Sequence, residues 1–130
     1  MSSPPTHSTA TASEVGAVRA VALDYIEGWY AADAERMERS LHDELVKRTP
    51  FRDDESTAGL RIVSKDRMVE LTSTGGGRDV ADPAIEVYVD DVSDDIASAR
   101  TVCADFVDYL HLVNTPDGWK IADIVFRSID

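Results

Sequence analysis

Four side chains of this sequence could bind or transform a small molecule: a phenol, an indole, an imidazole and a carboxylate. Tyr25 and Trp29 are four residues apart in a segment of helical periodicity, so they share one helix face. His42 carries the side chain whose pKa is most easily tuned near neutral pH. Asp108 lies in a strand-like apolar run, where a carboxylate is either paired or has a raised pKa. We expect Asp108 and His42 to act as acid and base, with Tyr25 donating to a ligand oxygen.

Each of these residues also has a structural alternative. An aromatic stripe at helical spacing, such as Tyr25 and Trp29, is often ordinary core packing. His42 follows a predicted helix, whose last carbonyls and dipole favour an imidazole. Asp108 could form a buried ion pair with Arg48, which we keep as a ligand-binding candidate.

His111 completes the set of ligand-binding candidates. It lies three residues after Asp108, and odd spacing places the two on opposite faces of one strand unless a bulge intervenes. The three histidines have no short spacing and Cys103 has no second cysteine, so we expect no metal site and no cofactor. Phosphate-binding, dinucleotide-binding and nucleophile-elbow motifs are also missing from the sequence.

The composition is typical of one acidic globular domain. The chain has 130 residues, a hydrophobic fraction of 43% and a net charge of −12, which disfavours nucleic-acid and membrane partners. We expect residues 1–12 to be a disordered leader and residues 13–130 to be a single domain. Without a signal-peptide pattern, and with one cysteine, the expected location is the cytoplasm.

The last quarter of the chain predicts a β-hairpin at the centre of the sheet. Two apolar-rich runs, 106–113 and 119–126, flank a turn-forming segment that contains Pro116 and Gly118. One alternative joins residues 96–113 into a single bent strand. Apolar side chains occur on both faces of the first run, so we expect the chain's helices on one face and a second subunit on the other. This pattern predicts a homodimer through the sheet face.

The remaining elements follow from caps, periodicity and breakers. A capping box at Thr11–Glu14 predicts a long first helix, in which Gly28 indicates a close backbone contact. The other predicted elements are a helix capped by Asp33 and ending near His42, a strand at 45–49 stopped by Pro50, a loop at 52–59, a strand at 60–63, a helix from Lys65 to about Thr74 capped by Ser64, a flexible connection at Gly75–Gly77, and strands near 85–90 and at 96–102. Helices on one face of a meander predict an α+β domain.

Several motifs in this order resemble the NTF2-like superfamily, and within it the bacterial SnoaL-like and "putative lumazine-binding" proteins. The motifs are Asp24–Tyr30, Leu41–His42, Ser64 with Met68–Glu70, Phe106–Leu112 and Gly118–Ile121. The resemblance implies a cone in which three N-terminal helices pack on a curved, mostly antiparallel sheet. It also implies a pocket between the first helix and the concave face of the sheet. This superfold supports many activities, so it does not fix one.

A second resemblance is to ketosteroid isomerase, through the spacing from Tyr25 to Asp33 to Thr49-Pro50. It implies that Tyr25 is the oxyanion donor. The position of the catalytic aspartate is occupied by Thr49, whose hydroxyl is too weak a base to abstract a proton beside a carbonyl. The sequence therefore departs from the isomerase pattern at the residue that moves the proton.

Three functional hypotheses remain. The first is a dimeric pocket protein that binds a small cyclic or aromatic metabolite. The second is an isomerase, dehydratase or cyclase that uses acid and base residues in the same pocket. The third is an interaction module without a ligand, against which an open cavity of a few hundred Å3 would count.

Overall fold

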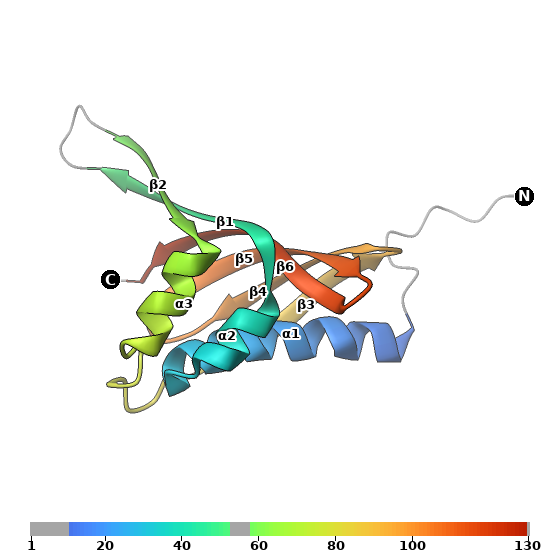
Figure 1. Ribbon diagram of the computed structural model, residues 1–130, viewed down its shortest axis with the longest axis horizontal. Coiled ribbons are helices and arrows are strands. Elements are labelled where there is room, and N and C mark those ends of the chain that lie inside the picture. The colour runs from blue at the N-terminus through green and yellow to red at the C-terminus, as the bar shows by residue number, and fades with distance from the viewer. Residues whose placement is uncertain (1–10, 53–57, 130) are drawn as a thin grey trace, which may run out of the picture.

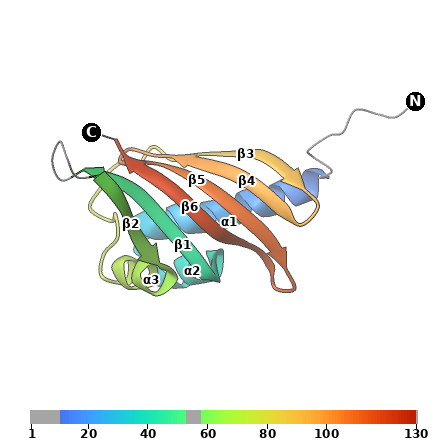
Figure 2. The same ribbon diagram turned by 90° about the horizontal axis from the view of Figure 1, so that it is seen from above.

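Three helices cover one face of a six-stranded sheet (Figures 1 and 2). The structure is a computed structural model, and it describes residues 11–52 and 58–129. The elements are α1 (Ala12–Ala31), α2 (Ala34–Ser40), β1 (Leu41–Arg52), β2 (Ala58–Ser64), α3 (Lys65–Ser73), β3 (Glu86–Ser93), β4 (Ile96–Val102), β5 (Phe106–Thr115) and β6 (Gly118–Ser128). The predicted α+β class is confirmed. Residues 1–10 of the predicted leader and residues 53–57 of the predicted loop lie outside the described residues.

The sheet has the strand order β2-β1-β6-β5-β4-β3 (Figure 2). All neighbours pair antiparallel except β1 and β6, which are parallel. The hairpin of β5 and β6 is confirmed, and β4 ends at Val102, so residues 96–113 are not one bent strand. Because β6 also pairs with β1, the hairpin connects β1 and β2 to β4 and β3 within one sheet.

The helix caps follow the sequence. Thr11 and Glu14 form the reciprocal capping box of α1, and the side chains of Asp33 and Ser64 each accept a hydrogen bond from a backbone amide that begins the next helix. The close contact expected at Gly28 is also present: an added Cβ would lie 3.2 Å from the backbone nitrogen of Met37. This contact brings α2 tightly against α1.

Two local predictions were wrong. Strand β1 does not stop at Pro50 but continues to Arg52. Beyond Arg48 it pairs only with β2, so half of its amides face no partner strand and a missing N–H is tolerated. The glycine run is closely packed rather than a loose connection. The Gly77 amide donates to the Trp29 carbonyl at 3.0 Å, and a Cβ on Gly76 would overlap that same carbonyl oxygen.

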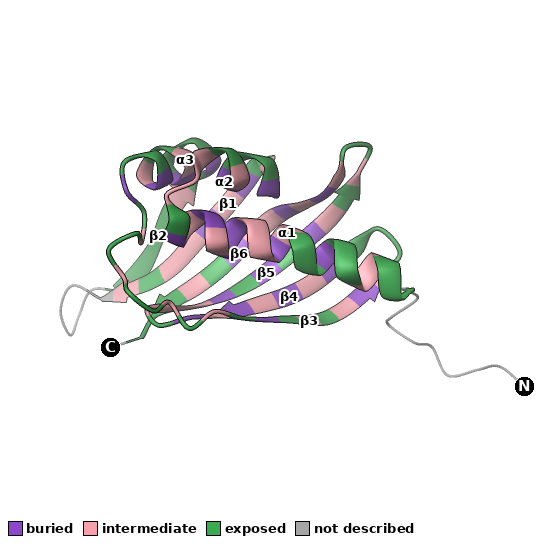
Figure 3. Cartoon of the chain, turned by 90° about the horizontal axis from the view of Figure 1, so that it is seen from below, coloured by how far each residue is buried: buried purple, intermediate pink, exposed green. Residues whose placement is uncertain are grey.

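The core lies between the helices and the concave face of the sheet. Figure 3 shows α1 crossing this face, with α2 and α3 beside it. On β5, Leu110 and Leu112 are fully buried, whereas Tyr109, on the opposite face, is 60% exposed. The helices therefore cover one of the two apolar faces, and the other is open in the single chain.

Candidate functional site

A small cavity lies between α1, α3 and the concave face of the sheet. Its volume is about 120 Å3. Most of its wall is apolar and aromatic, and three polar side chains contribute to it. The lining residues are Tyr25, Ile26, Trp29, Lys47, Val63, Met68, Leu71, Phe106, Asp108 and Phe126. Tyr25 and Trp29 lie one helical turn apart on α1, as their spacing predicted, and both face this cavity.

Lys47 and Tyr25 form the polar centre of the cavity. The Lys47 ammonium donates a hydrogen bond to the Tyr25 hydroxyl oxygen at 2.8 Å, and both residues are buried. The Met68 sulfur lies 3.6 Å from the same nitrogen. The nitrogen also lies 4.4 Å from the centre of the Phe126 ring, within the range of a cation–π contact. A phenol, a thioether and a ring face therefore surround the amine.

Asp108 enters the site from β5. In the sheet register it lies opposite Thr101 of β4 and Phe126 of β6, and only 2% of its surface is exposed. The Thr101 hydroxyl donates to Asp108 Oδ2 at 3.2 Å. Oδ1 is buried without a hydrogen-bond partner among the described residues. Since an unpartnered buried oxygen is costly, this atom keeps an unused capacity to accept a hydrogen bond.

Burial shifts the pKa value of each of the three polar groups in the direction that favours its uncharged form. It raises the pKa of Asp108, although the Lys47 charge and the hydroxyls of Tyr25 and Thr101 lower it in part. It lowers the pKa of Lys47, and the negative charge of Asp108 offsets only part of that effect. Burial, followed by the Asp108 charge, raises the pKa of Tyr25 well above 10.0. The site thus holds an acid and an amine that both lose their charge more readily than in water.

His42 lies outside this cavity. It borders a separate, polar cavity of about 390 Å3, together with Lys65 and Lys120. The structural alternative, in which His42 binds the last carbonyls of the preceding helix, was wrong. His42 Nδ1 accepts a hydrogen bond from the Glu44 amide at 3.0 Å, and the Lys120 ammonium donates to the Arg39 carbonyl at the end of α2. The structure therefore does not bring His42 and Asp108 together.

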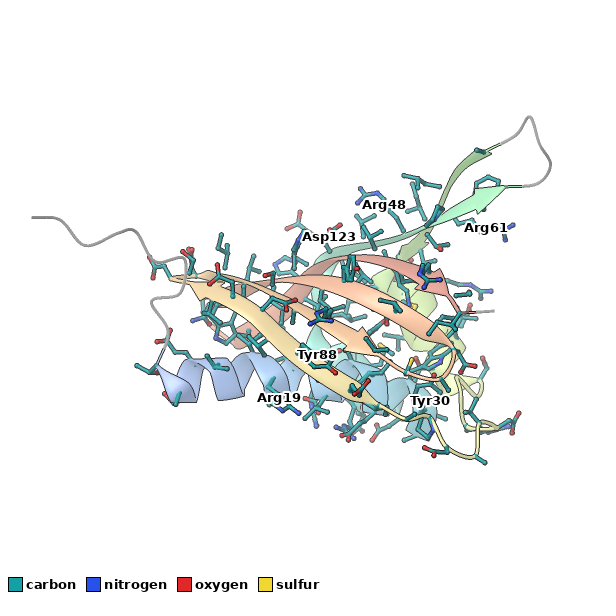
Figure 4. All side chains as sticks on the ribbon, turned by 180° about the vertical axis from the view of Figure 1, so that it is seen from behind. Arg19, Tyr30, Arg48, Arg61, Tyr88 and Asp123 are labelled. Atoms are coloured by element: carbon teal, nitrogen blue, oxygen red, sulfur yellow. The ribbon has the colours of Figure 1, made fainter. Side chains whose placement is uncertain are left out.

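Arg48 and His111 lie on the opposite face of the sheet. Arg48 Nη1 donates to Asp123 Oδ1 at 3.0 Å, and His111 Nδ1 lies 3.2 Å from Asp123 Oδ2. Figure 4 shows Arg48 and Asp123 on the side of the sheet away from α1. The alternative ion pair between Arg48 and Asp108 was wrong, because Arg48 points to the outer face and pairs with Asp123 there.

Lys47 is the site residue that the sequence interpretation missed. Strand alternation contained the signal, since Lys47 lies two residues after the buried Leu45 and shares its face. Thr49 is not among the residues that line the cavity. Strand β1 instead contributes an amine, Lys47, two residues before the Thr49 position that the catalytic aspartate occupies in ketosteroid isomerase.

Two further observations concern the described residues. No three His, Cys, Asp or Glu side chains between residues 11 and 52 or 58 and 129 converge as a metal site would require. In the same part of the chain, no helix has the length and apolarity of a membrane span.

The curved sheet, the three helices and the pocket beneath α1 define an NTF2-like α+β cone. The chain belongs to the "putative lumazine-binding" family, whose model matches residues 13–127. No curated protein sequence matches the chain.

Solved structures share this fold. An NTF2-like protein of unknown function from Shewanella baltica aligns with a TM-score of 0.74 and 18% identity, covering 94% of this chain and 98% of its own. One from Silicibacter pomeroyi gives 0.73 and 17%, over 93% and 100% of the two chains. A ketosteroid isomerase-like protein from Erwinia carotovora gives 0.65 and 20%, over 92% and 99%. At these identities the likeness establishes the fold.

Proposed function

We propose that the protein binds a small cyclic or aromatic metabolite in the cavity of Tyr25, Lys47 and Asp108. The observation that carries this proposal is Asp108 Oδ1, which has no hydrogen-bond partner among the described residues and is buried in the wall of a mostly apolar cavity. A ligand that brings a hydrogen-bond donor to this oxygen relieves the cost of burying it. The adjacent Lys47 amine offers a donor to an oxygen on the same ligand.

The cavity volume limits the size of the ligand. At about 120 Å3 it approaches the engineered cavity of about 150 Å3 that accepts benzene, and it is below the usual range of ligand pockets. A single six-membered ring is the expected size. A two-ring molecule requires the aromatic side chains that line the cavity, Trp29 and Phe126, to move.

The test uses two matched probes, 2-pyridone and N-methyl-2-pyridone. The first presents an N–H beside a carbonyl, and the second has the carbonyl without the N–H. We expect 2-pyridone to bind with a dissociation constant on the order of millimolar, as suits a fragment of this size. Asp108→Asn should weaken this binding about tenfold, and N-methyl-2-pyridone should not compete. Native mass spectrometry of the gently purified protein would show any natural ligand directly.

Equal binding of the two probes, or equal binding to wild type and Asp108→Asn, would refute the assignment of the site. Failure of 2-pyridone to saturate the protein, combined with an empty purified protein, would refute the pocket function and favour the interaction-module hypothesis. The cavity is smaller than a few hundred Å3, so its size alone does not decide between these two hypotheses.

A second candidate is an acid–base enzyme of the isomerase, dehydratase or cyclase type. The observation in its favour is that the pKa of Lys47 is lowered and the pKa of Asp108 is raised, so both pKa values are shifted toward neutral pH. Turnover of a cyclic ketone or hydroxyketone that is lost in Asp108→Asn would support it.

For the open sheet face we propose a homodimer. Tyr109 and Val125, neighbours on β5 and β6, are 60% and 43% exposed on this face. We expect sedimentation at micromolar concentration to show a dimer that Tyr109→Asp dissociates. Ala20→Asp, on the exposed surface of α1, is the control and should leave it intact. A wild-type monomer would refute the proposal.

A further inference from the structure

The chain has three lysines, and they occupy different electrostatic environments. The Lys65 ammonium pairs with carboxylates of Asp43 at 2.8 Å and Glu38 at 3.2 Å. Lys120 is half-buried and donates to the backbone carbonyl of Arg39. Lys47 is buried, and no carboxylate oxygen of the described residues lies within the 4.0 Å of an ion pair. Lys47 is therefore a buried amine without a counter-ion in contact.

The surroundings of Lys47 favour its uncharged form. Burial lowers its pKa, whereas at Lys65 burial is outweighed by the ion pairs to Asp43 and Glu38, which raise the pKa of that amine. An uncharged lysine has a free electron pair on Nζ and is a nucleophile. Of the two buried lysines, only Lys47 combines this condition with access to an apolar cavity.

We propose that Lys47 forms an imine with a small aldehyde or ketone that enters the cavity. The inference rests on the proposed function, because it specifies the chemical class of ligand that the same cavity holds. The aromatic wall accepts the ring of the ligand, and its carbonyl group meets the amine.

The bond changes are those of an ordinary condensation. The Nζ electron pair attacks the carbonyl carbon, and the carbonyl π electrons pass to oxygen, which receives a proton from the nitrogen. Protonation of the resulting hydroxyl by Asp108 breaks the C–O bond and releases water, leaving an iminium beside the Asp108 carboxylate. Return of the N–H proton to Asp108 gives the imine. Amine and carbonyl compound are thus converted to imine and water, and no oxidant or reductant is consumed.

The neighbouring groups are suited to these steps. Burial raises the pKa of Asp108, so this residue can hold the proton that the leaving oxygen needs. The Tyr25 hydroxyl, 2.8 Å from Nζ, fixes the position of the amine in the cavity. Asp108 is accordingly assigned the proton transfer, and Tyr25 acts as a positioning residue.

The experiment traps the imine by reduction. The full chain is incubated with benzaldehyde and sodium cyanoborohydride near neutral pH, and the labelled sites are mapped by peptide mass spectrometry. We expect Lys47 to be labelled at least about tenfold faster than Lys120, because the cavity holds the aldehyde beside the Lys47 amine and burial lowers the pKa of that amine. Asp108→Asn should slow the labelling of Lys47 and leave that of Lys120 unchanged.

Two controls keep the result interpretable. Lys47→Met replaces the amine with an apolar side chain of similar length, and it should remove the fast label without unfolding the protein. Benzyl alcohol has the same ring but no carbonyl, so it should compete for the cavity and protect Lys47 in the unmodified chain. This second control does not depend on how any variant folds.

The outcomes separate the two proposals. If 2-pyridone binds while Lys47 is labelled no faster than Lys120, the imine inference is overturned and the binding function stands. If 2-pyridone does not bind, benzyl alcohol gives no protection and Lys47 is not labelled preferentially, both are overturned. Fast labelling of Lys47 that benzyl alcohol suppresses supports the inference.

Discussion

Replacing Tyr25 with phenylalanine tests whether the hydrogen bond to Lys47 stabilises the buried amine. Tyr25→Phe removes one oxygen atom and keeps the ring, so the packing of α1 on the sheet is preserved. The oxygen lost is the acceptor that lies 2.8 Å from Lys47 Nζ. Among the described residues, only the Met68 sulfur, a weak acceptor at 3.6 Å, then remains near this nitrogen.

The expected cost follows from burial. Removing the acceptor of a buried donor costs about 1–3 kcal/mol of stability, and both partners here are buried, so solvent does not replace the lost hydrogen bond. We therefore expect Tyr25→Phe to lower the free energy of unfolding by about 2 kcal/mol. With an m-value of about 1.5 kcal/mol/M in urea, the midpoint should fall by roughly 1.3 M.

Equilibrium unfolding in urea, followed by the fluorescence of Trp29 and Trp119, measures this difference. The matched control is Tyr109→Phe, the same chemical change at a side chain that is 60% exposed. That control should shift the free energy of unfolding by no more than about 0.5 kcal/mol. If Tyr25→Phe changed stability as little as Tyr109→Phe, the phenol would not stabilise the amine and the account of the site would be wrong.

Three further variants test the pKa shifts and the packing. Burial lowers the pKa of Lys47 below 10.5, so the unfolded chain binds more protons than the folded protein just below that pH. Wild type should therefore gain stability over Lys47→Met as the pH rises toward 10.5. The control is Lys65→Met, which removes a lysine of raised pKa, and wild type should show no such gain over this variant in urea titrations across the same pH range. A stability difference between wild type and Lys47→Met that does not change with pH would contradict the lowered pKa of Lys47. Burial raises the pKa of Asp108 above 3.8, so the folded protein binds more protons than the unfolded chain just above that pH. Asp108→Asn should therefore gain stability over wild type as the pH rises above 3.8, and a loss there would contradict the shift. Gly76→Ala should lower thermal stability by more than Gly118→Ala. Both glycines have a positive φ, so each substitution costs about 1–2 kcal/mol, but only the Cβ added at Gly76 would also overlap a backbone oxygen. Equal losses of stability would rule out that overlap.

The sequence by itself determined the local elements of this protein. Capping chemistry placed the starts of the three helices, at Thr11, Asp33 and Ser64, because a side chain that satisfies an orphan amide acts within three residues. Alternation and turn residues determined the hairpin of β5 and β6 in the same way. The pairing of Tyr25 with Trp29 on one face of α1 also required only helical periodicity.

The tertiary structure alone decided which polar groups meet. The parallel pairing of β1 with β6 brings Lys47 into the cavity of Asp108, although the two are far apart in sequence. One residue further along β1, Arg48 turns to the outer face and joins His111 and Asp123. Because side chains alternate along a strand, a step of one residue changes the face, and only the register across the sheet fixes the neighbours. Sequence periodicity could thus identify Asp108 as a buried acid, but its neighbouring amine depended on the fold.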